Sequence, residues 1–116
     1  MLFKFKITTP ANTPAASKQK TTLPLLQGKI IQTTVLFPPG PSGLLHLQIY
    51  RGSRQVVPLN DGEDIRGNNV TFIFPEELLL LAEPYELIAY TWNESTQYEH
   101  EVDIYITLSR SGVFIE

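Results

Sequence analysis

Apolar and polar residues alternate with a period of two through most of this chain, and no other feature constrains its fold as strongly. Within residues 45–50 and 102–109, every second residue is Leu, Ile or Val. Successive side chains of a β-strand point to opposite faces of a sheet, so this spacing predicts antiparallel strands with one buried face. The longest apolar run, residues 78–82, is far shorter than the roughly 20 residues of a membrane helix. We therefore expect an all-β protein without a membrane partner.

Proline, glycine and asparagine separate the predicted strands. The strongest stop is Pro-Pro-Gly-Pro-Ser-Gly at residues 38–43, and residues 51–54 predict a tight hairpin turn. Residues 76–82 have helix-forming composition between two prolines and predict a turn or short helix. Residues 93–97 predict a hairpin loop between the last two strands. The predicted strands are residues 2–8, 28–37, 45–50, 55–59, 70–74, 85–92 and 99–109.

This pattern predicts a single antiparallel β-sandwich or jelly roll of seven to eight strands. The chain has 116 residues, of which 42% are hydrophobic, which suits one domain with one core. Residues 9–22 are rich in Thr, Pro and Ala and predict an extended linker. We therefore expect an N-terminal strand and arm at residues 1–22 and a sandwich domain at residues 23–116.

The last predicted strand has a defined core phase. Its apolar residues should face the core, and the residues between them should face solvent. The four residues predicted to face the core are Val102, Ile104, Ile106 and Leu108.

The charges divide the chain into two halves. All twelve acidic residues lie between Asp61 and Glu116, so residues 61–116, which also contain Arg66 and Arg110, have a charge of −10. The first sixty residues contain five Lys, two Arg and no acid, a charge of +7. The sequence leaves open whether these opposite charges meet within one molecule or between molecules.

Two clusters resemble metal ligands in composition but not in spacing. Glu99 and Glu101 flank His100, yet on a strand both acids share one face while the histidine points to the other. Residues 60–64 are rich in oxygen ligands but lack the D-x-D-x-D-G spacing of a calcium loop. A solvated strand and a polar loop are therefore the favoured interpretations, and we expect no metal.

Residues for nucleophilic catalysis are also missing from the sequence. There is no cysteine, and no G-x-S-x-G motif surrounds Ser42 or Ser53. We therefore expect a protein that is not an enzyme and needs no cofactor.

Three aromatic residues form a possible ligand platform: Tyr50, Tyr90 and Trp92. Tyr90 and Trp92 share one strand face with Ile88, so a core position for Trp92 is favoured over a platform. The lysines of the basic half are spread too thinly in an acidic chain to indicate nucleic-acid binding. Lys4 and Lys6 are instead typical of a protected edge strand.

The overall architecture resembles a known family. A short N-terminal strand, the proline-punctuated segment Thr9-Pro10-Ala11-Asn12-Thr13-Pro14 and a cysteine-free sandwich resemble small structural proteins of tailed-phage-like particles, capsid decoration proteins in particular. Residues 37–40, 43–50 and 90–93 look like segments of small β-proteins of that kind. This resemblance implies a β-domain on a capsid or virion surface, commonly a trimer, with an arm that reaches a neighbour.

The sequence therefore favours a non-enzymatic structural protein that self-associates or coats a larger assembly. The first eight residues lack the apolar run of a secretory signal, so we expect synthesis in the cytoplasm. In trans, the N-terminal strand would add to a neighbour's sheet edge; in cis, it would fold onto its own sheet. The candidate arm residues are Leu2, Phe3, Lys4, Phe5, Lys6 and Ile7. The alternative function is a carbohydrate- or ligand-binding sandwich that uses the aromatic platform.

Overall fold

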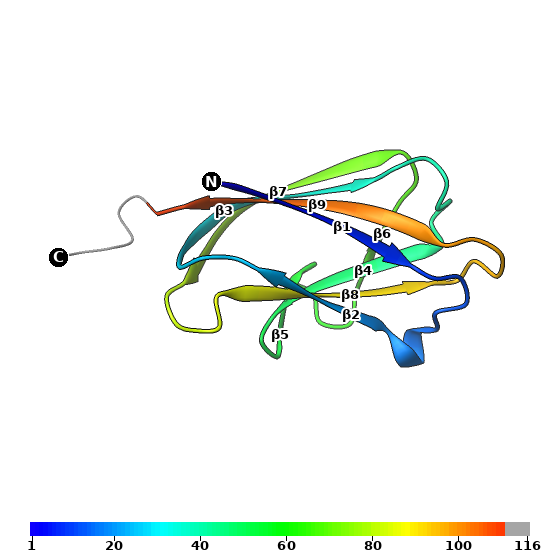
Figure 1. Cartoon of the computed structure of the whole chain (residues 1–116), viewed down its shortest axis with the longest axis horizontal. Helices are drawn as coiled ribbons and strands as arrows, with labels where there is room; N and C mark the ends of the chain where they lie inside the picture. Colours follow the sequence, from blue (N-terminus) through cyan, green and yellow to red (C-terminus); the bar gives the residue numbers. More distant parts are fainter. Residues whose placement is uncertain (111–116) are drawn as a thin grey trace.

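Two antiparallel β-sheets pack face to face in the computed structural model, which describes residues 1–110 (Figure 1). The predicted β-sandwich is confirmed, with nine strands in the described part of the chain. Residues 111–116, the end of the predicted sandwich domain, lie outside the described residues. None of the helical structure in residues 1–110 is long and apolar enough to cross a membrane.

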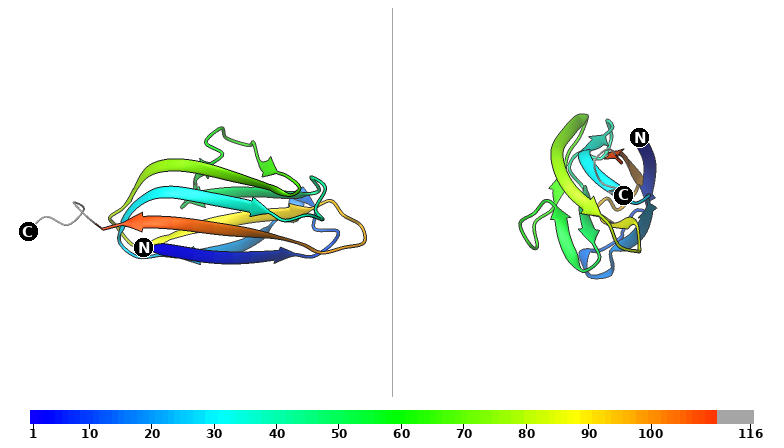
Figure 2. Two further views of the ribbon diagram at one scale, coloured as in Figure 1. Left: turned by 90° about the horizontal axis from the view of Figure 1, so that it is seen from above. Right: turned by 90° about the vertical axis from the view of Figure 1, so that its left-hand side faces the viewer.

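The first sheet, sheet A, has the strand order β1-β9-β3-β7, and Figure 2 shows its four strands side by side. All three pairings are antiparallel. Strands β1 and β7 are therefore the two edges of this sheet. The strands are β1 (Leu2–Thr9), β9 (His100–Ser109), β3 (Gly28–Phe37) and β7 (Val70–Leu80).

The second sheet, sheet B, has the order β2-β8-β4-β5, and the short strand β6 also pairs with β4. One 3₁₀ turn, η1 (Ala15–Ser17), precedes β2. The predicted tight turn between β4 and β5 is confirmed, because Arg51 pairs with Arg54 across Gly52, whose φ is +61°. The strands are β2 (Gln19–Pro24), β8 (Glu86–Asn93), β4 (Leu45–Arg51), β5 (Arg54–Val57) and β6 (Ile65–Arg66).

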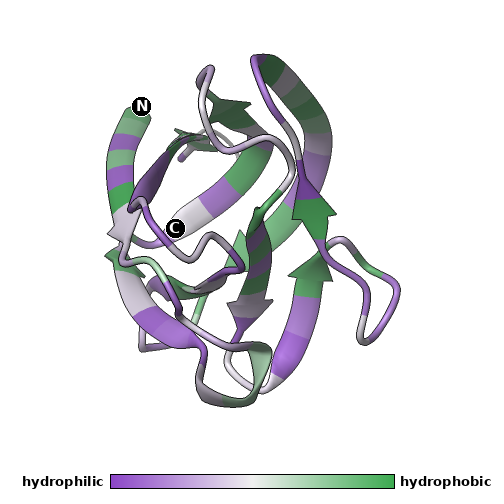
Figure 3. Ribbon diagram, turned by 90° about the vertical axis from the view of Figure 1, so that its right-hand side faces the viewer, coloured by the Kyte–Doolittle hydropathy of each residue, from purple (hydrophilic) through white to green (hydrophobic). Residues whose placement is uncertain are grey.

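The core lies between the inner faces of the sheets. Every second residue of β9 contributes to it, and the predicted phase of this strand is confirmed, because Val102, Ile104, Ile106 and Leu108 are buried. Leu45, Leu47 and Ile49 face them from β4. Figure 3 shows the same alternation of hydrophobic and hydrophilic residues along β1.

Most connections cross from one sheet to the other, and only β4, β5 and β6 follow one another within a sheet. The prediction of a hairpin loop at residues 93–97 is therefore wrong. Strands β8 and β9 lie in different sheets, so this segment is a crossover at one end of the sandwich. Alternation shows which face of a strand is buried but not which sheet contains the strand.

The prediction of a turn or short helix at residues 76–82 is also wrong, because β7 continues to Leu80. Pro75 does not end the strand. It lies on an edge strand, where a missing N–H costs no ladder hydrogen bond if it faces away from the neighbour. The pairing of residues 78–80 with the start of β3, beyond an irregularity near Ile31, overrides the local helix propensity.

The N-terminal strand folds onto its own sheet, which is the cis arrangement. All eight residues of β1 pair with β9, Phe3 and Phe5 pack against the core, and Ile7 is buried. The expected boundary at residues 22 and 23 falls inside β2, so the last part of the predicted linker is a strand. Pairing with β8 explains this, because it satisfies the backbone groups of residues 19–24 that face β8.

Some of the basic residues of the first half of the chain contact acidic residues of the second half within one molecule. Basic β1 lies beside acidic β9, with Lys6 opposite Asp103 in the register. The Nζ of Lys6 is 3.6 Å from Oε1 of Glu101. The Nζ of Lys4 lies 5.7 Å from the centre of the Tyr105 ring. The opposite charges of the two halves of the chain therefore contribute to the pairing of β1 with β9.

Candidate functional site

The outer face of sheet B carries the aromatic residues that the sequence singled out. Leu45, Leu47 and Ile49 of β4 point into the core, so the residues between them point outward. The register places His46 opposite Trp92 and Gln48 opposite Tyr90. Polar and aromatic side chains of two central strands thus meet on a face that does not belong to the core.

Tyr50 and Tyr90 form the centre of a hollow on this face. Their ring centres are 5.1 Å apart and the rings are nearly perpendicular, at 81°. Both tyrosines are half-buried. The hollow has a volume of about 200 Å³, and the hairpin between β4 and β5 forms one side of it. Its lining residues are Lys18, Gln48, Tyr50, Gly52, Ser53 and Tyr90.

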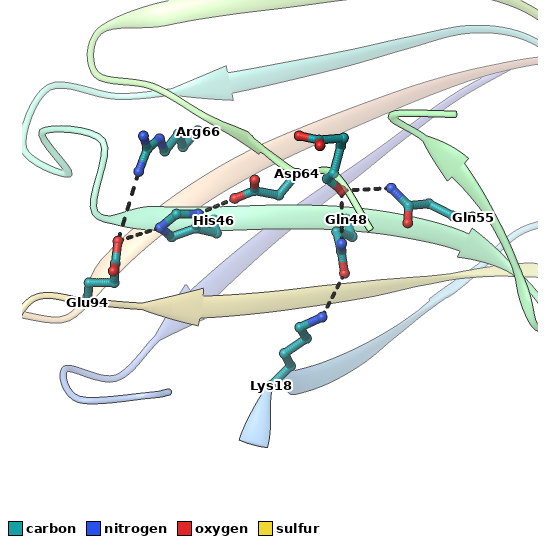
Figure 4. A network of polar contacts seen from close by, with 8 residues as sticks. Lys18, His46, Gln48, Gln55, Asp64, Arg66 and Glu94 are labelled. Atoms are coloured by element: carbon teal, nitrogen blue, oxygen red, sulfur yellow. Dashed lines mark hydrogen bonds and ion pairs between the residues drawn. The ribbon is translucent and has the colours of Figure 1, made fainter. Parts of the chain in front are cut away.

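Gln48 fixes the floor of the hollow. Its side chain is buried, and its Oε1 accepts a hydrogen bond of 3.1 Å from Nζ of Lys18. Its Nε2 donates to the backbone oxygen of Glu63 at 2.9 Å, and Nε2 of Gln55 donates to the same oxygen at 2.8 Å (Figure 4). These bonds hold the loop of residues 58–64 against β4 and β5. A buried amide without such partners would cost about 1–3 kcal/mol, so the network stabilises this loop.

His46 occupies the centre of a second polar cluster beside the hollow. Its Nδ1 contacts Oδ2 of Asp64, and its Nε2 lies 2.6 Å from Oε2 of Glu94. Arg66 is within 4.0 Å of the same Glu94 oxygen. Because both ring nitrogens face carboxylates, the imidazole links the polar loop to the end of β8. This arrangement is a structural clamp in which neither nitrogen points to open solvent.

Trp92 occupies neither of the two environments considered from the sequence. It is buried, with 9% of its surface exposed, but it lies on the outer face of sheet B and not in the core between the sheets. Its ring stacks on His46 with centres 4.8 Å apart. The Nζ of Lys18 lies 4.6 Å from the ring centre on this face. The structure therefore brings Tyr50 and Tyr90 together and places Trp92 beneath a lysine next to them.

The cluster around His100 lies at the end of the sandwich. His100, Glu99 and Glu101 line a hollow of about 330 Å³ together with the proline-rich turn of residues 38–41. Among residues 1–110, no three His, Asp or Glu side chains are grouped as they would be around a metal ion. The loop of residues 60–64 uses its backbone and Asp64 to bind side chains of sheet B.

Sheet A has two edges of different character. The candidate arm residues lie in β1 at one edge, where Leu2 is 65% exposed and Lys4 and Lys6 are exposed beside it. At the other edge, β7 exposes Ile73 by 61% and Leu79 by 51%. Nothing in the sequence indicated this second edge, because the length of β7 depends on its pairing with β3.

Lys18 and Gln48 also belong to the tyrosine hollow, although neither was predicted as a site residue from the sequence. Gln48 alternates with Tyr50 on the polar phase of β4, and this spacing was a usable signal. Lys18 lies in the segment predicted as a linker, and nothing near it in the sequence indicates a contact with β4.

Sequence comparison gives no relationship from which a function can be transferred. No protein-family model matches the chain, and no curated protein has a significantly similar sequence.

Proposed function

We propose that this chain is a non-enzymatic structural protein that self-associates by joining the β7 edge of one molecule to the β1 edge of the next. One observation carries the proposal: sheet A ends in two edge strands that expose apolar side chains and differ in charge. Lys4 and Lys6 belong to β1, whereas Glu76 and Glu77 belong to β7. Exposed strand edges are templates for pairing with another chain.

The pairing of β1 with β9 determines which backbone N–H and C=O groups of β1 point to the free edge of the sheet. Met1 exchanges backbone hydrogen bonds with Leu108, so the groups of Phe3, Phe5 and Ile7 also point to β9. Those of Leu2, Lys4 and Lys6 point to the free edge. The carbonyl of Thr8 is already occupied, because Nε2 of Gln19 donates to it at 3.0 Å. The available part of this edge is therefore residues 2–6.

The same alternation can be followed across β9 and β3 to β7. It directs the backbone groups of Phe72 and Phe74 to β3, and those of Thr71, Ile73 and Pro75 to the free edge. The missing N–H of Pro75 thus lies at the free edge. Pro75 and the two glutamates limit unspecific pairing in the middle of the strand, while the exposed leucine and isoleucine flank them.

Strand directions allow the two edges to join. Adjacent strands of sheet A are antiparallel throughout, so β1 of a second molecule, added in the orientation that continues the sheet, runs antiparallel to β7. A register that places Leu2 opposite Leu79 also places Lys4 opposite Glu77. Opposite charges in cross-strand positions stabilise pairing by roughly 0.2–1 kcal/mol.

This contact is heterologous, because it joins two different surfaces. Such contacts form a closed ring when a whole number of the rotations that relate neighbouring molecules completes a full turn, and an open array when it does not. The resemblance to capsid decoration proteins favours a trimeric ring and extends the proposal to the surface of a virion or similar particle.

The experiment is a measurement of molar mass by light scattering across protein concentration, with charge reversals at the two edges. Lys4→Glu should raise the dissociation constant about fivefold, and so should Glu77→Lys. The double variant should recover association, because the pair is restored with its charges exchanged. Lys20→Glu on sheet B is the matched control and should have no effect.

Salt adds a second readout. Raising the salt concentration from about 0.05 to 0.5 M should weaken an association that depends on exposed charges. A chain that is monomeric at all concentrations, or a double variant that associates no better than the single ones, would refute the proposed contact.

A further inference from the structure

We infer that the tyrosine hollow on sheet B is a binding site for an acidic saccharide, that is, a sugar ring that carries a carboxylate. This site lies on the opposite sheet from the assembly edges, so it does not depend on the proposed function. The inference rests on three properties of the hollow: its aromatic walls, the sign of its charge, and its open polar rim.

The aromatic walls suit a sugar ring. Sugars present C–H groups on one face, and these pack against the π-face of an aromatic ring. The rings of Tyr50 and Tyr90 are nearly perpendicular and therefore form a corner. A sugar ring in this corner can pack against the face of one tyrosine while the other tyrosine lies beside it. A nucleic-acid base prefers a flat stacking platform, which the perpendicular pair does not provide.

The charge of the hollow favours an anion. Its six lining residues include Lys18 but no Asp or Glu. An ammonium group has three N–H donors, of which Lys18 directs one to Gln48. Lys20 pairs with Tyr90 in the register and therefore projects from the same face. A carboxylate that binds here would meet the ammonium group of Lys18, and Lys20 adds positive charge to the same face, in a chain whose net charge is −3.

The rim is open and polar. Gly52 lines the hollow, and apart from its two chain neighbours no residue lies within 4 Å of the position that a Cβ would occupy there. Ser53, which also lines the hollow, adds a polar residue to this rim. The floor is rigid, because Gln48 is fixed by hydrogen bonds on both ends of its amide. An aromatic corner with a few fixed polar groups is the usual composition of a small-ligand site.

The proposed site has an internal reporter. Nζ of Lys18 lies over the ring of Trp92, the only tryptophan of the chain. A ligand carboxylate that draws this ammonium group toward the hollow changes the electrostatic environment of the indole. Binding should therefore change the emission of Trp92 without contact between the sugar and Trp92.

The test compares 3′-sialyllactose with lactose by titration calorimetry and tryptophan fluorescence. Sialyllactose should bind saturably, and lactose should bind about tenfold more weakly because it lacks the carboxylate. Lys18→Gln should remove the preference for the acidic sugar. Tyr90→Ala should abolish binding of both sugars, while Tyr90→Phe, which keeps the ring, should retain it.

Tyr105→Ala on the outer face of sheet A is the matched control, and it should bind sialyllactose like the parent chain. Circular dichroism verifies that each variant is folded. The inference is overturned if folded parent protein shows no saturable binding of sialyllactose, or if Tyr90→Ala binds it as well as the parent does. Saturable binding of single-stranded oligonucleotides in place of sialyllactose would also overturn it.

Discussion

Replacing Ile104 by alanine tests the packing on which both proposals depend. Ile104 is completely buried in β9, an inner strand of sheet A, with Phe5 of β1 and Val35 of β3 as its cross-strand neighbours. The substitution removes three carbon atoms, which corresponds to about 2.4 kcal/mol of transfer free energy at about 0.8 kcal/mol for each methylene group.

The cavity adds to this loss. Strands on both sides of Ile104 are held by backbone hydrogen bonds, so they cannot move far enough to fill the space. We therefore expect the free energy of unfolding to fall by about 3–4 kcal/mol, within the usual range for such substitutions. This is a large fraction of the roughly 5–15 kcal/mol that stabilises a domain.

The assay is urea unfolding, followed by far-ultraviolet circular dichroism and by the fluorescence of Trp92. Thr107→Ala is the matched control, because Thr107 lies on the same strand with its side chain on the opposite face. It should change stability by less than about 0.5 kcal/mol, with an unchanged denaturant slope. A loss of under about 1 kcal/mol for Ile104→Ala, together with a larger loss for Thr107→Ala, would show that the register of β9 is reversed.

Three further predictions concern other parts of the molecule. Deleting residues 1–9 should abolish cooperative unfolding, because it removes the eight-residue ladder on β9 and uncovers the core; a truncated chain with parental stability would show that β1 is dispensable. His46→Ala should destabilise the fold by about 2 kcal/mol and shift the emission of Trp92 to the red, because it removes the stacked ring and both carboxylate contacts. His100→Ala is the control and should leave the emission of Trp92 unchanged. Burial raises the pKa of the Glu76 carboxyl group above its ordinary value of 4.5, so the folded state binds the carboxyl proton more tightly than the unfolded state does. The free energy of unfolding therefore falls as pH rises from the unfolded-state pKa through the folded-state pKa. Glu76→Gln should therefore unfold at higher urea than the parent at pH 7 and at the same urea near pH 3, and equal midpoints at both pH values would contradict this account.

The alternation of residues in this sequence was sufficient to predict the fold class and much of its detail. It identified the buried face of β9 and placed Tyr90 and Trp92 on one strand face, while turn residues such as Gly52 predicted the hairpin at residues 51–54. These features are local, because the side-chain period of a strand is set by its own backbone geometry and needs no knowledge of neighbours.

Only the tertiary structure decided which strands are neighbours. Met1 bonds to Leu108 across a separation of 107 residues, and Lys18 reaches Gln48 from a segment with no periodic signal. Residues 76–80 form a strand because β3 offers them a partner, although their own composition favours a helix. Strand order depends on which arrangement buries the most apolar surface and pairs the most backbone groups over the whole chain, and such a global balance is not written in any single segment.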